Sequence, residues 1–140
     1  MVYVDTSALV PLFIREPNSD AVIHWLESSG ERLAISEWTF VEFASAAAIK
    51  LRTGQATAKL VNQATARMHE FAQKHCTIAV PGRESFRRAA ELTGDHALKL
   101  RAGDALHLAI AESLDTQGIL CLDQAMIESA RSLGMNVARL

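Results

Sequence analysis

Four acidic side chains lie where the expected strands end or the expected helices begin. Asp5 follows the apolar run VYV and Asp123 follows ILCL, whereas Glu42 lies within SEWTFVEFASAAAIKL and Asp104 opens DALHLAIA. Four carboxylates packed together without a cation would repel one another and could not all stay ionised. The set therefore predicts a divalent metal site, and its oxygen ligands favour Mg²⁺ or Mn²⁺ over zinc.

Each acid taken alone also has a structural explanation. Asp5 and Asp123 could cap the helices that follow them, and Asp104 could be a first-turn acid favoured by the helix dipole. Glu42 is harder to explain in this way, because its neighbours are apolar and a glutamate is rarely buried without a partner. The metal-site hypothesis thus depends on the four acids together.

The elements that must position these acids are short apolar runs separated by amphipathic segments. Strands joined by helices imply parallel pairing through right-handed crossovers. We expect one α/β domain over residues 1–140, with a central parallel sheet of about five strands between two layers of helices. Ligands bind beyond the carboxyl ends of such strands, so all four acids should share one rim. The expected strands are 1–5, 32–36, 76–80, 118–123 and 136–140. The expected helices are 7–15, 19–28, 39–51, 55–75, 84–93, 102–114 and 124–134.

Composition narrows the class of protein. The chain of 140 residues is 49% hydrophobic and 21% charged, as in a folded globular protein. Its net charge of −2 argues against a basic protein that coats nucleic acid, although bound cations and a local basic rim can reverse the potential of one cleft. Cys76 and Cys121 lie far apart in apolar runs and are expected to be buried, reduced thiols. We see no secretory signal and no apolar run near the ~18 residues of a membrane span, so we expect a cytoplasmic protein.

Several other polar residues lie near the four acids in the sequence. Thr6 is either a helix cap or a neighbour of the site. His107 follows Asp104 by three residues and could reach a metal. A lone histidine between leucines is more often structural or solvent-facing, however, so we leave it out of the ligand set. Lys99 and Arg101 shortly precede Asp104 and are the best candidates for contacting a phosphate backbone.

A resemblance to a known family rests on four segments: VYVDTSALVPLF, SEWTFVEFASAAAIKL, LRAGDALHLAIA and LCLDQAMIESARSLGM. In this order and spacing they closely resemble the PIN domain, and within it the VapC toxins of bacterial toxin–antitoxin pairs. The resemblance covers nearly the whole chain and implies strand order 3-2-1-4-5, a homodimer, and a VapB-like antitoxin that often inserts an arginine into the acidic pocket. One departure is Cys121, which stands where many relatives carry Thr or Ser. The family's catalytic, metal-binding acids match Asp5, Glu42, Asp104 and Asp123.

The leading hypothesis is therefore a Mg²⁺- or Mn²⁺-dependent endoribonuclease that acts as a toxin. Asp5 and Asp104 are the expected direct ligands, with Glu42 and Asp123 completing the shell directly or through water. One alternative is aspartyl-phosphate transfer through Asp5, although the D-x-D pattern of such phosphatases is missing. Another is a non-catalytic scaffold or RNA-binding module whose acids hold a structural ion.

Overall fold

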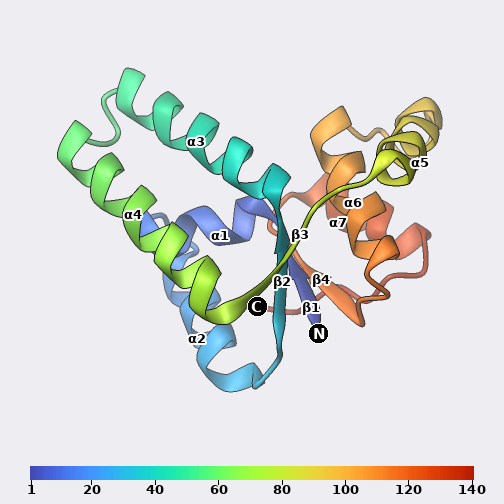
Figure 1. Cartoon of the computed structure of the whole chain (residues 1–140), viewed down its shortest axis with the longest axis horizontal. Helices are drawn as coiled ribbons and strands as arrows, with labels where there is room; N and C mark the ends of the chain where they lie inside the picture. Colours follow the sequence, from blue (N-terminus) through green and yellow to red (C-terminus); the bar gives the residue numbers. More distant parts are fainter.

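Short parallel strands alternate with helices throughout the computed structural model, which describes residues 1–140. The elements in chain order are β1 (Val2–Val4), α1 (Thr6–Phe13), α2 (Ser19–Ser29), β2 (Leu33–Ser36), α3 (Glu37–Arg52), α4 (Ala58–His75), β3 (Cys76–Ala79), α5 (Arg83–Gly94), α6 (Ala102–Ser113), β4 (Gly118–Leu120) and α7 (Gln124–Ser132). Helices α1 to α4 lie on one side of the sheet and α5 to α7 on the other (Figure 1). The three-layer α/β architecture predicted from the sequence is confirmed.

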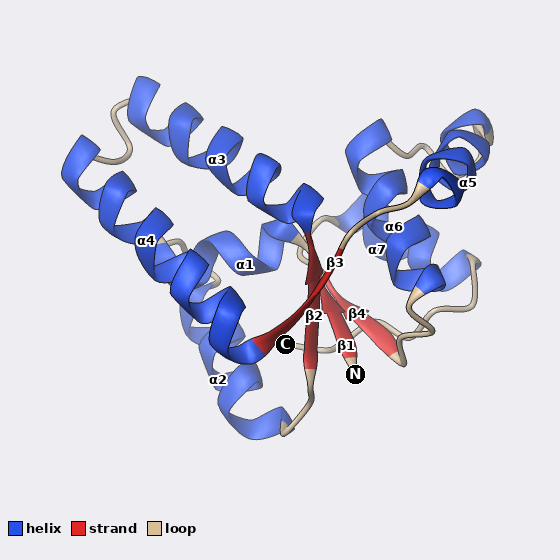
Figure 2. Cartoon of the chain, viewed as in Figure 1, coloured by secondary structure: helices blue, strands red, loops and turns tan.

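The sheet has four parallel strands in the order β3-β2-β1-β4, and β1 and β2 are its two central strands (Figure 2). The expected fifth strand at 136–140 is reduced to one parallel bridge between Ile119 and Val137. Two backbone hydrogen bonds hold this segment, from Ile119 N–H to the Asn136 carbonyl and from Ala138 N–H to the Ile119 carbonyl. Because β4 itself is only three residues long, it offers little edge for a longer ladder. The predicted order thus holds, with a bridge in place of its last strand.

Side-chain alternation along the strands divides the core into two layers. Val2 and Val4 pack toward α1–α4, whereas Tyr3 between them packs toward α5–α7. Phe43 and Met68 fill the first layer, and both are almost fully buried. None of the helices combines the length and apolar character that crossing a membrane requires.

The carboxyl ends of the strands are also where helices begin. Asp5 is the N-cap of α1, and Asp123 is the N-cap of α7. Ser36 and Thr39 form a capping box at the start of α3, as expected of a strand that runs directly into a helix. Parallel pairing brings these helix starts to one edge of the sheet, so the residues at that edge come from distant parts of the sequence.

Candidate metal centre

Asp5 lies at the end of the central strand β1 and is almost completely buried, with 4% of its surface exposed. Its Oδ2 accepts hydrogen bonds from the backbone N–H of Ser7, at 2.9 Å, and from the Ser7 hydroxyl. Its other oxygen, Oδ1, lies 3.3 Å from His107 Nε2. The capping role and the site role are therefore compatible, because each uses a different oxygen.

Glu42 reaches the same place from the second turn of α3. Its Oε2 lies 2.6 Å from His107 Nε2, and 27% of its side chain remains exposed. Burial alone raises the pKa of Glu42, but the hydrogen bond and charge of His107, with help from Thr6, outweigh it and lower the pKa below its ordinary value. The structure thus supplies the partner that a glutamate in an apolar helix requires.

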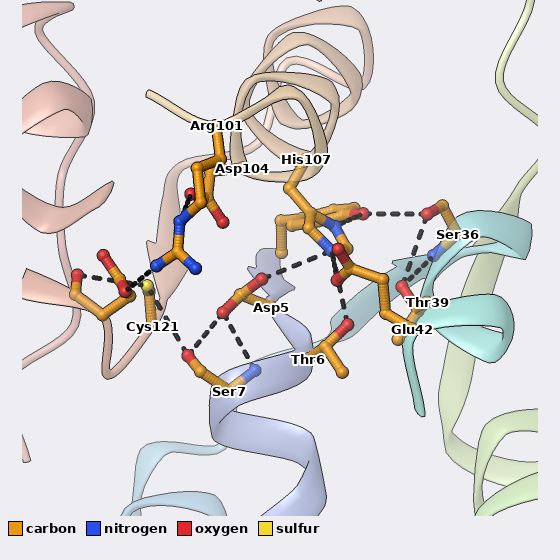
Figure 3. Close-up of polar contacts among 12 residues, drawn as sticks. Asp5, Thr6, Ser7, Ser36, Thr39, Glu42, Arg101, Asp104, His107 and Cys121 are labelled. Carbon is orange, nitrogen blue, oxygen red and sulfur yellow. Dashed lines mark hydrogen bonds and ion pairs between the residues drawn. The ribbon is translucent and has the colours of Figure 1, made fainter. Parts of the chain in front are cut away.

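His107 is fully buried between the two carboxylates (Figure 3). Its Nδ1 lies 2.7 Å from the Tyr3 hydroxyl, and its Nε2 lies 3.3 Å from Thr6 Oγ1. Burial alone lowers the pKa of His107, but the bond to Glu42 and the negative charges of Asp5 and Glu42 raise it overall. Of the two roles expected for His107, structural or solvent-facing, the buried position agrees with the structural one. The spacing of three residues from Asp104, which places both on one helix face, was the available signal.

Asp5, Glu42 and His107 form a group whose potential ligand atoms all lie within 4.8 Å of one another. The two carboxylates provide the oxygen donors that Mn²⁺ and Mg²⁺ accept, and His107 contacts both of them. The residues present therefore fit a divalent cation. Asp104, expected with Asp5 as a direct ligand, lies outside this tight group.

Asp104 and Asp123 border the same space from α6 and from the start of α7. Arg101 lies between them, with its Nε 3.6 Å from Asp104 Oδ2 and its Nη2 3.5 Å from Asp123 Oδ2. Burial raises the pKa of Asp104, Arg101 opposes that rise, and the negative charges of the other three acids add to it. All four predicted acids thus lie at the same edge of the sheet, close enough for their charges to interact. Two of them belong to the tight group, and the other two lie across from it.

Ser7 and Cys121 lie next to Asp5 at the ends of β1 and β4. The Ser7 hydroxyl accepts a hydrogen bond from the Leu122 backbone N–H at 2.9 Å and lies 3.7 Å from Cys121 Sγ. Burial, followed by the charge of Asp5, raises the pKa of Cys121 far above its ordinary value. The Cys121 thiol therefore stays protonated and does not act as a thiolate.

A cleft of about 640 Å³ leads away from the acids. Glu42, Arg101 and Asp123 line one end, and the cleft continues between α1 and α3 to the ion pair of Lys50 with Glu16. Lys50 and Arg101 are the two cationic side chains that line the cleft, and each is paired with a carboxylate.

The chain is similar in sequence to known proteins. The model of the PIN domain matches residues 2–131. A curated relative, Ribonuclease VapC46 of Mycobacterium tuberculosis, is 30% identical over 138 residues, which cover 97% of this chain and 95% of the relative.

Solved structures with low sequence identity share the fold. The crystal structure of Mycobacterium tuberculosis VapC20, described as a Sarcin-Ricin loop cleaving toxin, superposes over 100% of both chains with a TM-score of 0.76 and 14% identity. A toxin–antitoxin complex from Klebsiella pneumoniae contains a chain with a TM-score of 0.61 and 19% identity, over 88% of this chain and 87% of that one.

Proposed function

Because the chain belongs to the PIN-domain family, we propose that it is an endoribonuclease that uses Mg²⁺ or Mn²⁺ and acts as a VapC-like toxin. The observation that carries the proposal is the convergence of Asp5 and Glu42 within 4.8 Å at the end of the central strand. Asp104 and Asp123 border the same space, and Ribonuclease VapC46 supports the assignment of RNA as substrate.

The acids have different roles in this proposal. Asp5 would hold the cation, and Ser7 fixes its carboxylate through two hydrogen bonds to Oδ2. Glu42 and Asp123 would complete the surroundings of the cation, directly or through water, and orient the attacking molecule, and Asp104 contributes negative charge opposite Asp5. A bound divalent cation would lower the pKa of a coordinated water and offset the charge on the scissile phosphate. The chain needs no serine, cysteine or histidine nucleophile for this reaction.

The RNA backbone would follow the cleft between α1 and α3. Arg101 is 82% exposed at its side chain and stands next to the acids, so it is free to turn toward a phosphate. Lys50 stands at the far end of the same cleft, paired with Glu16. Because the chain carries a net charge of −2, these two cations and the metal would supply the attraction for the substrate.

We also infer a VapB-like antitoxin partner and a homodimer. The structural relative from Klebsiella pneumoniae is described as a toxin–antitoxin complex, which supports the first inference. Val41 and Ile49 on α3 are large apolar side chains that are 56% and 45% exposed, which supports an interface on this helix. Co-expression with any small open reading frame that precedes the gene, followed by affinity capture and measurement of the mass in solution, tests both.

Cleavage assays of the purified protein test the nuclease directly. We expect RNA to be cut with Mn²⁺ or Mg²⁺ and to remain intact with EDTA. Asp5→Asn should abolish cleavage, whereas Asp20→Asn, which removes an exposed acid paired with Arg15, should not. Sequencing the RNA ends produced in cells would then identify the substrate. Cleavage by Asp5→Asn at the wild-type rate would refute the mechanism.

A further inference from the structure

Both carboxylate oxygens of Glu42 lie close to residues that are not acids, and one of the two is hydrogen-bonded. On one side, Oε2 lies 2.6 Å from His107 Nε2. On the other side, Oε1 faces the backbone of α6 at Gly103. A glutamate side chain has several rotatable bonds and loses considerable freedom when it is fixed in one position. Contacts at both oxygens restrict that freedom before any cation arrives.

The ring of His107 is itself fixed by a chain of buried hydrogen bonds. Nδ1 pairs with the Tyr3 hydroxyl at 2.7 Å, and that hydroxyl pairs with Ser36 Oγ at 2.9 Å. The Ser36 backbone N–H donates to Thr39 Oγ1 at 3.1 Å, which anchors the chain in the first turn of α3. The Tyr3 hydroxyl is therefore buried and bonded to both His107 and Ser36.

This arrangement also determines how His107 can act. When Tyr3 donates its hydroxyl proton to Nδ1, Nε2 carries the hydrogen that Glu42 accepts. The Nε2 lone pair is then not available to a metal, and Nδ1 faces away from the acids. His107 therefore acts through Glu42 and not as a ligand of its own.

Gly103 is the second neighbour of the Glu42 carboxylate, and it leaves room for Oε1 because it has no side chain. A Cβ at this position would lie 2.5 Å from Glu42 Oε1 and 3.7 Å from Trp38 Cζ2. The Trp38 indole also borders this side of Glu42 and helps to lower the pKa of its carboxylate. Because Oε1 is the end of a flexible side chain, an alanine at 103 would move Glu42 and leave the backbone in place.

We infer that His107 and Gly103 are positioning residues that together hold the Glu42 carboxylate in the orientation needed for cation binding. The inference rests on the proposed function, because the orientation matters only if Glu42 belongs to a metal site. Partners that orient metal-binding side chains commonly change metal affinity by about 10- to 100-fold when they are removed.

Mn²⁺ binding to the purified, metal-free protein, measured by calorimetry without RNA, tests this inference. We expect His107→Leu to weaken Mn²⁺ binding by about 10-fold or more. His107→Gln, which can place an N–H near the position of Nε2, should restore most of the affinity. Gly103→Ala should weaken binding to a similar extent without lowering the melting temperature. Gly94→Ala is the matched control, since that helical glycine has nothing within 4 Å of an added Cβ.

A double-variant comparison separates positioning from a general structural role. If His107 acts only through Glu42, then His107→Leu should have little further effect on Mn²⁺ affinity in a Glu42→Ala background. Equal losses in both backgrounds would overturn the inference. A Gly103→Ala variant whose Mn²⁺ affinity stays within twofold of wild type would also overturn the inference. If His107→Leu does not fold, the Mn²⁺ affinity of Gly103→Ala alone decides whether the inference stands.

The wild-type protein distinguishes this inference from the function on which it rests. Wild-type protein that binds no Mn²⁺ would overturn the proposed nuclease and the positioning roles with it. Wild-type protein that binds Mn²⁺ and cuts RNA, with unchanged affinity in the folded variants, would overturn the positioning roles alone.

Discussion

The Leu122 backbone N–H donates a hydrogen bond to Ser7 Oγ at 2.9 Å, and this bond joins the carboxyl ends of β1 and β4. The same hydroxyl donates to Asp5, so a single serine connects one predicted metal ligand to the loop that leads to Asp123. The relative position of two acids from opposite ends of the sequence therefore depends on one small polar side chain.

Removing this hydroxyl should affect both stability and the site. Ser7→Ala leaves the Leu122 N–H without its partner, which should lower the free energy of unfolding by about 1–3 kcal/mol. Mn²⁺ affinity should also fall, because Asp5 loses one of its two hydrogen-bond donors. Urea denaturation and calorimetry measure the two effects. Ser132→Ala is the control, since that exposed hydroxyl only donates within α7 to the Glu128 carbonyl. Equal stability of both variants would contradict the role of Ser7.

Asp104→Asn should separate folding from activity. Burial and the neighbouring acids raise the pKa of Asp104, so its ionised form is disfavoured in the folded protein. Replacing it by a neutral side chain should leave the metal-free protein at least as stable at pH 7, while RNA cleavage falls by roughly 100-fold or more. Thermal melts in EDTA and single-turnover cleavage test the two halves. A variant that unfolds more easily than wild type would contradict the electrostatic argument.

Arg101→Ala should change metal and RNA binding in opposite directions. The guanidinium lies between Asp104 and Asp123, where it competes with a cation, and exposed pairs of this kind contribute about 0.2–1 kcal/mol. Mn²⁺ affinity should therefore rise by a few-fold, whereas the KM for RNA should rise as a phosphate contact is lost. Arg15→Ala, which removes an exposed arginine on the α1–α2 connection, is the control. A variant whose affinities for both ligands fall would argue against this competition.

The stability of the metal-free protein should depend on pH through His107. Its pKa is raised in the folded state, so the protonated ring contributes stability that is complete below its ordinary value of 6.5 and is lost as the pH rises through the folded pKa. The pKa of Glu42 is lowered, so its contribution is present above 4.5 and is lost as the pH falls through its folded pKa.

Melting curves in EDTA from pH 5 to 9 measure this dependence. The stability advantage of wild type over His107→Gln should shrink as the pH rises above about 6.5, by about 1.4 kcal/mol for each unit of pKa shift. A constant difference across the range would show that His107 does not change its charge in the folded protein.

Mn²⁺ should stabilise the folded protein, and Asp5 should be required for this effect. A ligand at 100 times its Kd adds about 2.7 kcal/mol when it binds only the folded state. The melting temperature of wild type should therefore rise with Mn²⁺ concentration, and Asp5→Asn should show no such rise. An equal rise in both proteins would place the cation elsewhere.

The fold and the rim of acids could be predicted because their signals are local. Apolar runs, capping residues and helix periodicity each lie within a few neighbouring positions, and parallel strands then bring their ends together. The tight group could not be predicted in the same way. His107 and Glu42 are 65 residues apart, and their contact depends on how α3 and α6 pack. The role of Gly103 depends on one close approach, which no local pattern encodes.

The missing fifth strand has a similar explanation. Its sequence has the composition of a strand, but the extent of pairing depends on the length of the neighbouring edge, and β4 offers only Gly118–Leu120. Local preference gave the correct position beside Ile119, and tertiary context limited the ladder to one bridge.

The polar chain from Glu42 through His107 to Tyr3 joins the first strand to α6, which is translated about a hundred positions later. A polypeptide still attached to the ribosome therefore has no assembled acidic centre until most of its length has emerged. An incomplete chain that lacks α6 therefore lacks the contact that brings Glu42 beside His107 and Asp5.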